Sequence, residues 1–449
     1  MVGEWPRIKL GDLCGLITDG KHGDCEDHAD SGFYFLSVKD VVGNRLVYEN
    51  ARQITERDFA ETHRRTNLEP GDVLFTNTGT IGRMALAQED PRTYRTTFQK
   101  SVAILKPKRN LITPRFLYYL LHFDNAKLSD FAAGTTQKNL LLKDLRSFTV
   151  RVPSLPEQHA IAHIFGTLDD KIDLNRRMNE TLEAMARALF KSWFVDFDPV
   201  RAKHALSKVE GAEGRPSASS GQAFPGLPQA LADLFPDSFE DSELGEIPKG
   251  WEVGTLAEFA SINPESWSKE TRPDIINYLD LSNTKWGSIE AVTIYKPRDA
   301  PSRAQRVLRP GDTIVGTVRP GNGSYALISA DGLTGSTGFA VLRPRRPEYA
   351  QFVYLVATAA ESIEAFSHLA DGGAYPAVRP EVVIATQAIR PGDKVLAQFS
   401  MLSDPLLAAM AQNECESRSL AALRDTLLPK IISGELRIKG TEQSADLPN

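Results

Sequence analysis

The chain has 449 residues, of which 41% are hydrophobic and 24% charged, with a formal net charge of −6 and three cysteines. This composition is typical of a globular protein of two to four domains. The chain has no apolar run of the ~20 residues needed to cross a bilayer and begins with no apolar signal core, so we expect no membrane association. Three cysteines without a CxxC pair argue against a disulfide framework and favour the cytoplasm. The acidic total weakens a DNA-binding role without excluding it, because binding depends on where the charge lies.

Two distant stretches have the same pattern. They are "EPGDVLFTNTGTIGRMAL" (Glu69–Leu86) and "RPGDTIVGTVRPGNGSYAL" (Arg309–Leu327). Each has Pro-Gly-Asp, an apolar pair, a loop with Thr, Asn and Gly, and a final Ala-Leu. Further matches keep their order at a separation of roughly 240 residues, far longer than a solenoid repeat. The sequence therefore predicts two copies of a domain-sized unit.

Each copy begins with about 150 residues of mixed character, a typical domain size. Short apolar stretches such as "FYFLSV", "DVLFT" and "SVAIL" lie between Gly, Pro and Asn turns and are predicted strands. "PRFLYYLLHF" (Pro114–Phe123) has Pro in its first turn and apolar residues at helical spacing, which predicts a helix. The fold class expected for each globular part is therefore α/β, in the α+β sense.

A long helical segment follows each globular part. Residues recur at sevens in both segments: Ile161, Leu168, Asn175, Leu182 and Leu189 in the first, and Phe399, Leu406, Asn413, Leu420 and Leu427 in the second. At the matching d positions are Ile164, Met178 and Met185, and Leu402, Ala409 and Leu423. A strict seven-residue repeat predicts a coiled coil, and the alternative is an amphipathic helix packed on its own domain. Two matching helices with Asn at the middle a position favour mutual pairing.

These patterns define the expected boundaries. We predict a globular domain at 1–153, a helix at 154–200, a linker at 201–243, a second globular domain at 244–391, a second helix at 392–438 and a disordered tail at 439–449. The linker is indicated by Gly, Ser and Pro at 210–228. Pro405 interrupts the start of the second helix, which leaves that start open.

Three phrases carry a resemblance to a known family. They are "VPSLPEQHAIAHIFGTLDDKIDLNRRMNETLEAMARALFKSWFVDFDPV" (Val152–Val200), "PDSFEDSELGEIPKGW" (Pro236–Trp251) and "LAALRDTLLPKIISGEL" (Leu420–Leu436). They resemble the specificity subunit of Type I restriction–modification systems, and "GDLCGLITDGKHGD" and "GTTQKNLLLKDL" fit its target-recognition domains. The second copy departs from the pattern, because "RPGDKVLAQF" lacks the Pro-Glu-Gln of "LPEQHAI".

The resemblance implies a DNA-recognition subunit for phage defence. Two target-recognition domains would each read one half of a bipartite, asymmetric site in double-stranded DNA, and the two helices would pair antiparallel as a spacer. Two methylation subunits carrying S-adenosylmethionine would dock on the helices, and restriction subunits that use ATP and Mg²⁺ would join them. This chain would bind no cofactor and carry no catalysis.

Elementary geometry is compatible with that arrangement. Two like units in one chain can sit about a pseudo-twofold axis, as the subunits of a dimeric DNA-binding protein sit about a true one. A helix of about 37 residues would be ~55 Å long. Such a helix could hold two reading domains more than one DNA turn apart.

The sequence offers only weak candidates for a nucleotide-binding, metal or catalytic site. "GLITDGKH" (Gly15–His22) nearly matches a phosphate-binding loop, but His22 stands where a hydroxyl should ligate Mg²⁺. Cys14, His22, Cys25 and His28 could approach zinc spacing, although structural zinc usually has four ligands in tighter pairs. Neither an Asn-Pro-Pro-aromatic motif nor a Gly-x-Ser-x-Gly elbow occurs, so we expect no catalytic and no metal site.

DNA contacts would come from polar loops and basic residues. Candidates in the first copy are Lys21, His22, Thr76, Asn77, Thr78, Thr80, Gln99, Lys100, Thr136, Gln137 and Lys138; those in the second are Thr317, Arg319, Asn322, Ser324, Ser336, Thr337 and Tyr375. Each could equally be a solvated turn residue. The rival function is a DNA-free scaffold of two ligand-binding domains on a coiled coil.

An aromatic cluster ends the first helix. Phe190, Trp193, Phe194 and Phe197 lie within "LFKSWFVDFDPV". They would either cap the second recognition domain or form a partner surface, and we favour the cap.

Overall fold

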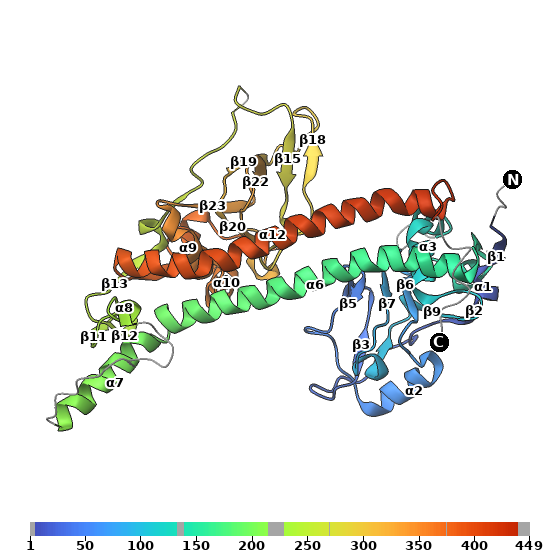
Figure 1. The fold of residues 1–449 in the computed structure, drawn as a ribbon, viewed down its shortest axis with the longest axis horizontal. Coiled ribbons are helices and arrows are strands. Elements are labelled where there is room, and N and C mark those ends of the chain that lie inside the picture. The colour runs from blue at the N-terminus through green and yellow to red at the C-terminus, as the bar shows by residue number, and fades with distance from the viewer. Residues whose placement is uncertain (1–4, 133–138, 214–228, 269, 374, 439–449) are drawn as a thin grey trace. The chain divides into compact units, whose positions relative to one another are not determined.

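The computed structural model describes residues 5–132, 139–213, 229–268, 270–373 and 375–438. The chain divides into two units. Unit 1 is Met1–Leu174 with Glu416–Asn449, and unit 2 is Asn175–Cys415. Each unit therefore contains one globular part and a half of each of two long helices, α6 (Leu155–Phe194) and α12 (Asp393–Ile432) (Figure 1). Within the described ranges, none of the helices is long and apolar enough to span a membrane.

The globular part of unit 1 is built on a four-stranded antiparallel sheet in the order β2-β9-β6-β7. Its strands are β1 (Arg7–Lys9), β2 (Cys14–Asp19), β3 (Tyr34–Leu36), β4 (Val41–Val42), β5 (Arg45–Leu46), β6 (Val73–Thr76), β7 (Met84–Leu86), β8 (Thr96–Phe98), β9 (Val102–Pro107) and β10 (Thr149–Arg151). Its helices are α1 (Leu10–Leu13), α2 (Glu56–Thr66), α3 (Pro114–Phe123), α4 (Asn125–Asp130) and α5 (Leu142–Ser147). β3 pairs with β8 in parallel, and β1 pairs with β10 antiparallel.

Unit 2 repeats this plan. Its main sheet has the order β14-β23-β20-β21, again antiparallel, while β15 pairs with β22 in parallel and β13 pairs with β24 antiparallel. The strands are β11 (Phe239–Ser242), β12 (Gly245–Pro248), β13 (Glu252–Thr255), β14 (Ala260–Ile262), β15 (Ile276–Leu279), β16 (Thr284–Lys285), β17 (Ser288–Ile289), β18 (Thr293–Tyr295), β19 (Ala304–Leu308), β20 (Thr313–Gly316), β21 (Tyr325–Leu327), β22 (Leu333–Ser336), β23 (Phe339–Pro344) and β24 (Gln387–Arg390). The helices are α7 (Asp198–Glu213), α8 (Gln229–Ala232), α9 (Ala350–Ala357), α10 (Ala360–His368) and α11 (Pro380–Ile384).

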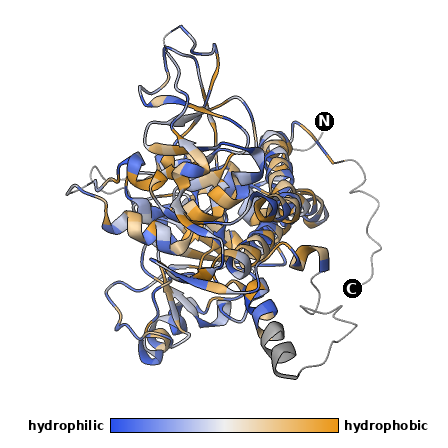
Figure 2. Cartoon of the chain, turned by 90° about the vertical axis from the view of Figure 1, so that its left-hand side faces the viewer, coloured by the Kyte–Doolittle hydropathy of each residue, from blue (hydrophilic) through white to orange (hydrophobic). Residues whose placement is uncertain are grey.

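The expected α/β class and the internal repeat are confirmed by the matching main sheets and by the matching pairs β3-β8 with β15-β22 and β1-β10 with β13-β24, although in unit 2 the strands β18 and β19 extend the second sheet. In each unit the strands and helices carry most of the hydrophobic residues, and the loops are mostly hydrophilic (Figure 2). The predicted helix Pro114–Phe123 is α3, with Pro114 in the first turn, where its missing N–H has no intrahelical partner to lose. α3 buries Phe116 and Leu120 with Phe75 of the sheet, which forms the core of unit 1.

The predicted linker at 201–243 needs correction at both ends. Residues Asp198–Glu213 form α7, and Leu231 and Phe235 are buried in the core of unit 2 with Trp251. Burial of these apolar side chains stabilises the folded state. The Gly, Ser and Pro residues of the middle stretch have too little apolar surface to contribute in this way. That stretch, 214–228, and the predicted tail at 439–449 lie outside the described residues.

The second long helix is not interrupted. α12 is continuous from Asp393 to Ile432 and passes through the exposed Pro405. The helix start that Pro405 left open is therefore Asp393, in agreement with the helix predicted at 392–438. A proline on the solvent-facing side of a long helix removes one backbone hydrogen bond, and packing of the opposite face can offset that loss.

The aromatic cluster at the end of α6 is a cap on unit 2, as favoured from the sequence. Trp193 is 1% exposed and Phe194 is 4% exposed. Phe194 packs against Phe352 of α9, with ring centroids 5.1 Å apart and nearly perpendicular planes. Trp193 meets the Phe235 ring at 5.0 Å in the same manner. Through these contacts the end of α6 covers the hydrophobic core of unit 2.

Candidate nucleic-acid interface

Four loops of unit 1 meet at one end of its main sheet. The backbone N–H of Lys21, after β2, donates to the carbonyl of Phe98 at 2.8 Å. The N–H of Asn77, after β6, donates to the carbonyl of Ser101 at 3.0 Å. Leu140, before α5, donates to the carbonyl of Asn77 at 2.8 Å. Segments far apart in the chain thus form one loop surface.

Unit 2 uses the same connections. The N–H of Thr317 donates to the Gly338 carbonyl at 2.8 Å, and that of Val378 donates to the Thr317 carbonyl at 2.9 Å. The N–H of Arg319 adds a 2.8 Å bond to the Pro376 carbonyl. Thr317 therefore occupies the place of Asn77, and Gly338 that of Ser101. The two loop surfaces share a backbone frame and differ in side chains.

Several candidate side chains support these loops from within. The side chains of five candidates are buried: Thr76, Asn77, Thr317, Ser324 and Ser336. The hydroxyl of Thr76 donates to the Thr80 carbonyl at 2.6 Å, and that of Ser324 donates to the Leu281 carbonyl at 3.0 Å. The Thr76 and Ser324 hydroxyls therefore satisfy the loop backbone, and a DNA contact by any of these five residues stays a prediction.

Other candidates are half-buried: Lys21, Thr78, Gln99 and Thr337. Lys21 lies 3.3 Å from a carboxylate oxygen of Asp58 and 3.5 Å from one of Glu61. Burial acts to lower the pKa of Lys21, but Cys25 and Asp58 outweigh it, so the pKa lies above its ordinary value. The ammonium is charged and already has acidic neighbours, which reduces its value as a phosphate ligand.

The exposed candidates are His22, Thr80, Lys100, Arg319, Asn322 and Tyr375. The Arg319 guanidinium lies over the Tyr375 ring, 4.7 Å from its centroid, which presents a cation and an aromatic face together. His22 Nε2 lies 3.0 Å from a carboxylate oxygen of Asp19. Thr136, Gln137 and Lys138 lie outside the described residues.

One exposed residue beside the loops was not a candidate. Trp286 stands in the turn between β16 and β17, and its backbone N–H donates to the Gly323 carbonyl at 2.6 Å. Gly323 closes the loop that carries Arg319 and Asn322. A Trp-Gly pair between two short strand segments was the available sequence signal.

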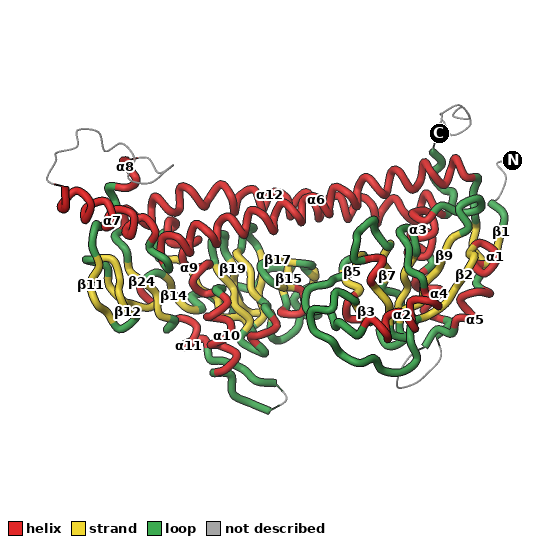
Figure 3. The backbone as a smooth tube through the Cα atoms, turned by 90° about the horizontal axis from the view of Figure 1, so that it is seen from below, coloured by secondary structure: helices red, strands yellow, loops and turns green. Residues whose placement is uncertain are grey.

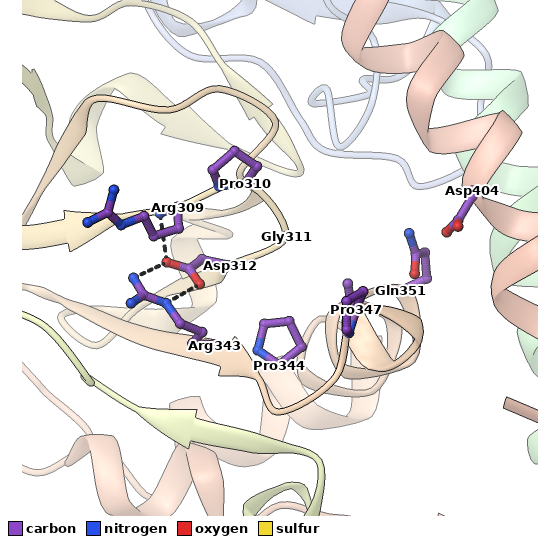
Figure 4. A pocket seen from close by; sticks show the side chains of 10 residues that line it. Arg309, Pro310, Gly311, Asp312, Arg343, Pro344, Pro347, Gln351 and Asp404 are labelled. Carbon is purple, nitrogen blue, oxygen red and sulfur yellow. Dashed lines mark hydrogen bonds and ion pairs between the residues drawn. The ribbon is translucent and has the colours of Figure 1, made fainter. Parts of the chain in front are cut away.

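The repeated Pro-Gly-Asp has a structural role. Asp312 is fully buried and accepts two hydrogen bonds of 2.9 Å from the guanidinium of Arg343 on β23 and one of 2.8 Å from the N–H of Arg309 (Figure 4). In unit 1, Asp72 accepts from Lys106 at 2.6 Å and from the N–H of Glu69 at 2.9 Å. The motif therefore anchors the turn before β6 and β20 to the neighbouring strand. Many of the candidate residues lie in the loops that follow β6 and β20.

The long helices run side by side within each unit (Figure 3), and their contacts show that they pair antiparallel. In unit 1, the Arg424 guanidinium donates to the Asp169 carboxylate at 2.6 Å, and Lys171 Nζ lies 3.1 Å from a carboxylate oxygen of Glu416. In unit 2, the Asn175 amide donates to the Asn413 carbonyl at 3.3 Å. The predicted positions at sevens, from Ile161 to Leu189 and from Phe399 to Leu427, are buried or half-buried.

The second layer of the helix pair differs from the expectation. Of the residues expected at d positions, Ile164 and Ala409 are half-buried, whereas Met178, Met185, Leu402 and Leu423 are exposed. The layer is formed instead by residues four positions after each a position: Phe165, Ile172, Asn179, Ala186 and Trp193 on α6, and Ser403, Met410, Ser417, Arg424 and Ile431 on α12. Positions i+3 and i+4 both neighbour i on a helix, so hydropathy alone did not separate them.

The near-match to a phosphate-binding loop is a strand followed by a tight backbone crossing. β2 covers Cys14–Asp19, and a Cβ on Gly20 would lie 1.8 Å from the Phe98 carbonyl oxygen. Burial raises the pKa of the Cys14 thiol to about 12, which disfavours the thiolate that metals require. The described residues hold no group of three or more His, Cys, Asp or Glu side chains placed to bind a metal ion.

Comparison with known proteins gives a consistent result. Residues 3–184 match the family described as the Type I restriction modification DNA specificity domain. The chain is 25% identical to the Type I restriction enzyme HindI specificity subunit of Haemophilus influenzae, over 97% of this chain and all of the relative. It is 24% identical to the MjaIX specificity subunit of Methanocaldococcus jannaschii, over 97% of this chain and 94% of that one.

A solved structure shares the fold. The Type I restriction–modification S subunit from M. genitalium aligns over 96% of both chains with a TM-score of 0.51 at 15% identity. The family match covers the first recognition domain and much of α6, and the relatives extend over nearly the whole chain. The repeated sheet, its loop surfaces and these likenesses agree: residues 3–184 match the Type I restriction modification DNA specificity domain, and the chain is similar over nearly its whole length to Type I specificity subunits.

Proposed function

We propose that the chain reads a bipartite, asymmetric site in double-stranded DNA, with the loop surface of each unit reading one half. The observation that carries this proposal is that two corresponding backbone hydrogen bonds hold the loops of each unit, while the side chains on those loops differ. Asn77, Ser101 and Leu140 in one unit correspond to Thr317, Gly338 and Val378 in the other by their hydrogen bonds. Two units that recognise different DNA sequences can share the same loop backbone but need different side chains on it, because individual side chains contact the base edges.

The exposed side chains fall into two roles. Lys100 and Arg319 would contact phosphates or guanine edges, and Asn322 has the donor and acceptor needed for an adenine edge. The net charge of −6 does not oppose this, since the acidic residues need not lie on the loop surfaces. The rival proposal of a DNA-free scaffold has no observation that favours it.

We further propose that two methylation subunits dock on the helix pair and that restriction subunits join the full complex. In unit 2 the exposed apolar side chains of the helices, Met178 and Met185 on α6 and Met401 and Leu402 on α12, offer a surface for such a partner. S-adenosylmethionine, ATP and Mg²⁺ would be bound by those partners. This chain would bind no cofactor, carry no catalytic residue and work in the cytoplasm.

A domain exchange tests the central proposal. Replacing Glu252–Arg390 with the equivalent region of another specificity subunit keeps α6, α7 and α12 and the residues that cap the core. Methylome sequencing of cells carrying the exchanged chain with its partner subunits should show one changed half-site and one unchanged half-site. If both halves change together, the units are not independent readers.

A binding assay separates a DNA reader from a scaffold. The methyltransferase assembly should lose affinity for random duplex steeply as salt rises, because each phosphate contact releases counterions. The variants Lys100→Ala and Arg319→Ala should each reduce that slope or relax the sequence preference of one half. A scaffold would give no salt-dependent binding at all.

A further inference from the structure

The two units carry equivalent hairpins with different tips. In unit 1, β4 and β5 pair Val42 with Arg45 across a two-residue turn, Gly43-Asn44. In unit 2, β16 and β17 pair Lys285 with Ser288 across Trp286-Gly287. The hydrogen bonds that close the hairpins also correspond. Val47 donates to the Asp40 carbonyl at 2.9 Å, and Glu290 donates to the Asn283 carbonyl at 2.8 Å.

Trp286 occupies a backbone conformation that its side chain disfavours. The two turn residues have φ values of +55° and +66° in unit 1, and of +46° and +86° in unit 2. Two successive positive φ values belong to the type I′ turn, in which Asn-Gly is strongly preferred. A bulky residue with positive φ is a true outlier, and such strain concentrates at functional sites.

The neighbouring glycine has a structural reason. A Cβ on Gly287 would lie 2.8 Å from the Tyr354 hydroxyl, so this position must stay glycine. Trp286 itself is 59% exposed. An asparagine at 286 would give the favoured Asn-Gly turn and relieve the strain.

The Trp286 ring is nevertheless held in one place. Its atoms lie 2.5 Å from where a Cβ on Gly323 would stand, so the loop closes against the ring only because Gly323 has no side chain. The ring also meets Tyr325 nearly perpendicularly, with centroids 6.0 Å apart. Together with the backbone bond to Gly323, these contacts make a rigid aromatic platform on the turn next to the loop that carries Arg319 and Asn322.

We propose that Trp286 is a specificity-determining residue of unit 2, whose ring makes an apolar contact with a base of the half-site that this unit reads. This inference rests on the proposed function. Aromatic and other apolar side chains contact thymine methyl groups or wedge between base steps, and they do so best when already held rigid. Unit 1 has Gly43 at this place and would read its half-site without such a contact.

The difference between the units favours DNA over a protein partner. A surface that docks the same methylation subunit twice should appear in both units, whereas a surface that reads unlike half-sites should differ. The hairpin backbones match and their tips do not, with Gly43-Asn44 in one and Trp286-Gly287 in the other. The hairpin tip therefore has the property expected of a segment that recognises DNA sequence.

The test compares three variants in the complex of this chain with its methylation subunits. Trp286→Asn removes the ring and relieves the strain, and Trp286→Phe keeps an aromatic ring. Gly43→Asn is the matched control in unit 1, where a Cβ would meet nothing within 4 Å. Affinity is measured for the duplex identified by methylome sequencing and for duplexes with single base changes in each half, and melting temperature is measured for each variant.

We expect Trp286→Asn to melt at a higher temperature and to bind the intact duplex about 5- to 150-fold more weakly, the range given by about 1–3 kcal/mol for an aromatic–base contact. Discrimination should relax only in the half read by unit 2. Trp286→Phe should lose less, and Gly43→Asn should leave both halves unchanged. Replacing thymines of that half with deoxyuridine should weaken the wild type, and not Trp286→Asn, if the ring contacts a methyl group.

Two results would overturn the inference. One is a Trp286→Asn complex with unchanged affinity and discrimination. The other is a variant that fails to assemble with the methylation subunits while any complex formed reads DNA normally, which would assign Trp286 to a protein interface. A wild-type complex without sequence-specific binding would instead overturn the proposed function itself.

Discussion

The side-chain amide of Asn413 donates a 2.8 Å hydrogen bond to Oδ1 of Asn179, joining the two long helices near their midpoints in unit 2. The amide of Asn179 in turn donates to the Met410 carbonyl at 3.2 Å, and that of Asn175 donates to the Asn413 carbonyl at 3.3 Å. Three amides from two successive layers thus link α6 and α12. Buried amides of this kind cost stability but define which residues face each other.

The first prediction separates register from stability. Replacing Asn175, Asn179 and Asn413 together by Leu should raise the melting temperature and allow alternative helix pairing, because an apolar layer has no unique partner. Asn413→Ala alone should lower the free energy of unfolding by about 1–3 kcal/mol, since Asn179 Oδ1 loses its donor. Chemical denaturation measures both, and cysteine cross-linking between the helices reports the register. A triple variant that melts lower and keeps one register would contradict this account.

The second prediction concerns the repeated Pro-Gly-Asp. Asp312→Ala should destabilise unit 2 by about 2–4 kcal/mol, because the Arg309 N–H and part of the Arg343 guanidinium lose their acceptor. Lys106→Arg in unit 1 is the matched control, since it installs the cation that unit 2 uses. The control should change the free energy of unfolding by less than about 1 kcal/mol. Equal effects of the two variants would mean that the carboxylate is not the anchor.

Much of the architecture could be predicted because it depends on patterns that recur along the chain. The duplicated motif located the repeat, and the seven-residue spacing located the helices and the central Asn175 and Asn413. The second helix layer could not be predicted, because exposed Met178 and Met185 are more hydrophobic than the buried Ala186 or the half-buried Asn179. An antiparallel partner accommodates small and polar residues that hydropathy does not rank as core.

The loop residues were harder for a different reason. A threonine or serine in a polar loop can face a ligand or satisfy its own backbone, and composition is the same in both cases. Thr76 and Ser324 proved to be internal, whereas Thr80 and Asn322 are exposed. Trp286 was not a candidate because DNA contacts were expected from polar and basic residues, and the positive φ of a tryptophan is not evident from a Trp-Gly pair in the sequence.

The third prediction concerns a cluster around Asp169 in unit 1. Its carboxylate accepts from the Tyr119 hydroxyl at 2.6 Å and from Arg424 at 2.6 Å, which ties α3, α6 and α12 together. Arg424→Ala should lower the free energy of unfolding by about 1–2 kcal/mol, a value between those of exposed and buried pairs. A double-mutant cycle with Asp169→Asn should give a coupling of similar size. Simple additivity of the two single effects would exclude the proposed bond.

The last prediction is a pH dependence carried by two histidines of unit 1. Burial lowers the pKa of His63, and burial followed by the charge of Arg424 lowers that of His122. In the unfolded chain both should titrate near the ordinary value of about 6.5. The unfolded state therefore binds protons that the folded state does not, so unfolding takes up protons. Stability is fully present above about pH 6.5 and is lost as the pH falls toward the lower, folded-state pKa values.

The free energy of unfolding can change by at most about 1.4 kcal/mol per pH unit for each histidine. We expect the melting temperature to fall between pH 7 and pH 5.5, a window above the usual range of carboxylate titration. The variants His63→Gln and His122→Gln should each flatten that fall. Calorimetry of the wild type and of the two variants across this window measures the effect. A wild-type melting temperature that rises on acidification would show that the folded state holds these imidazoles in their charged form.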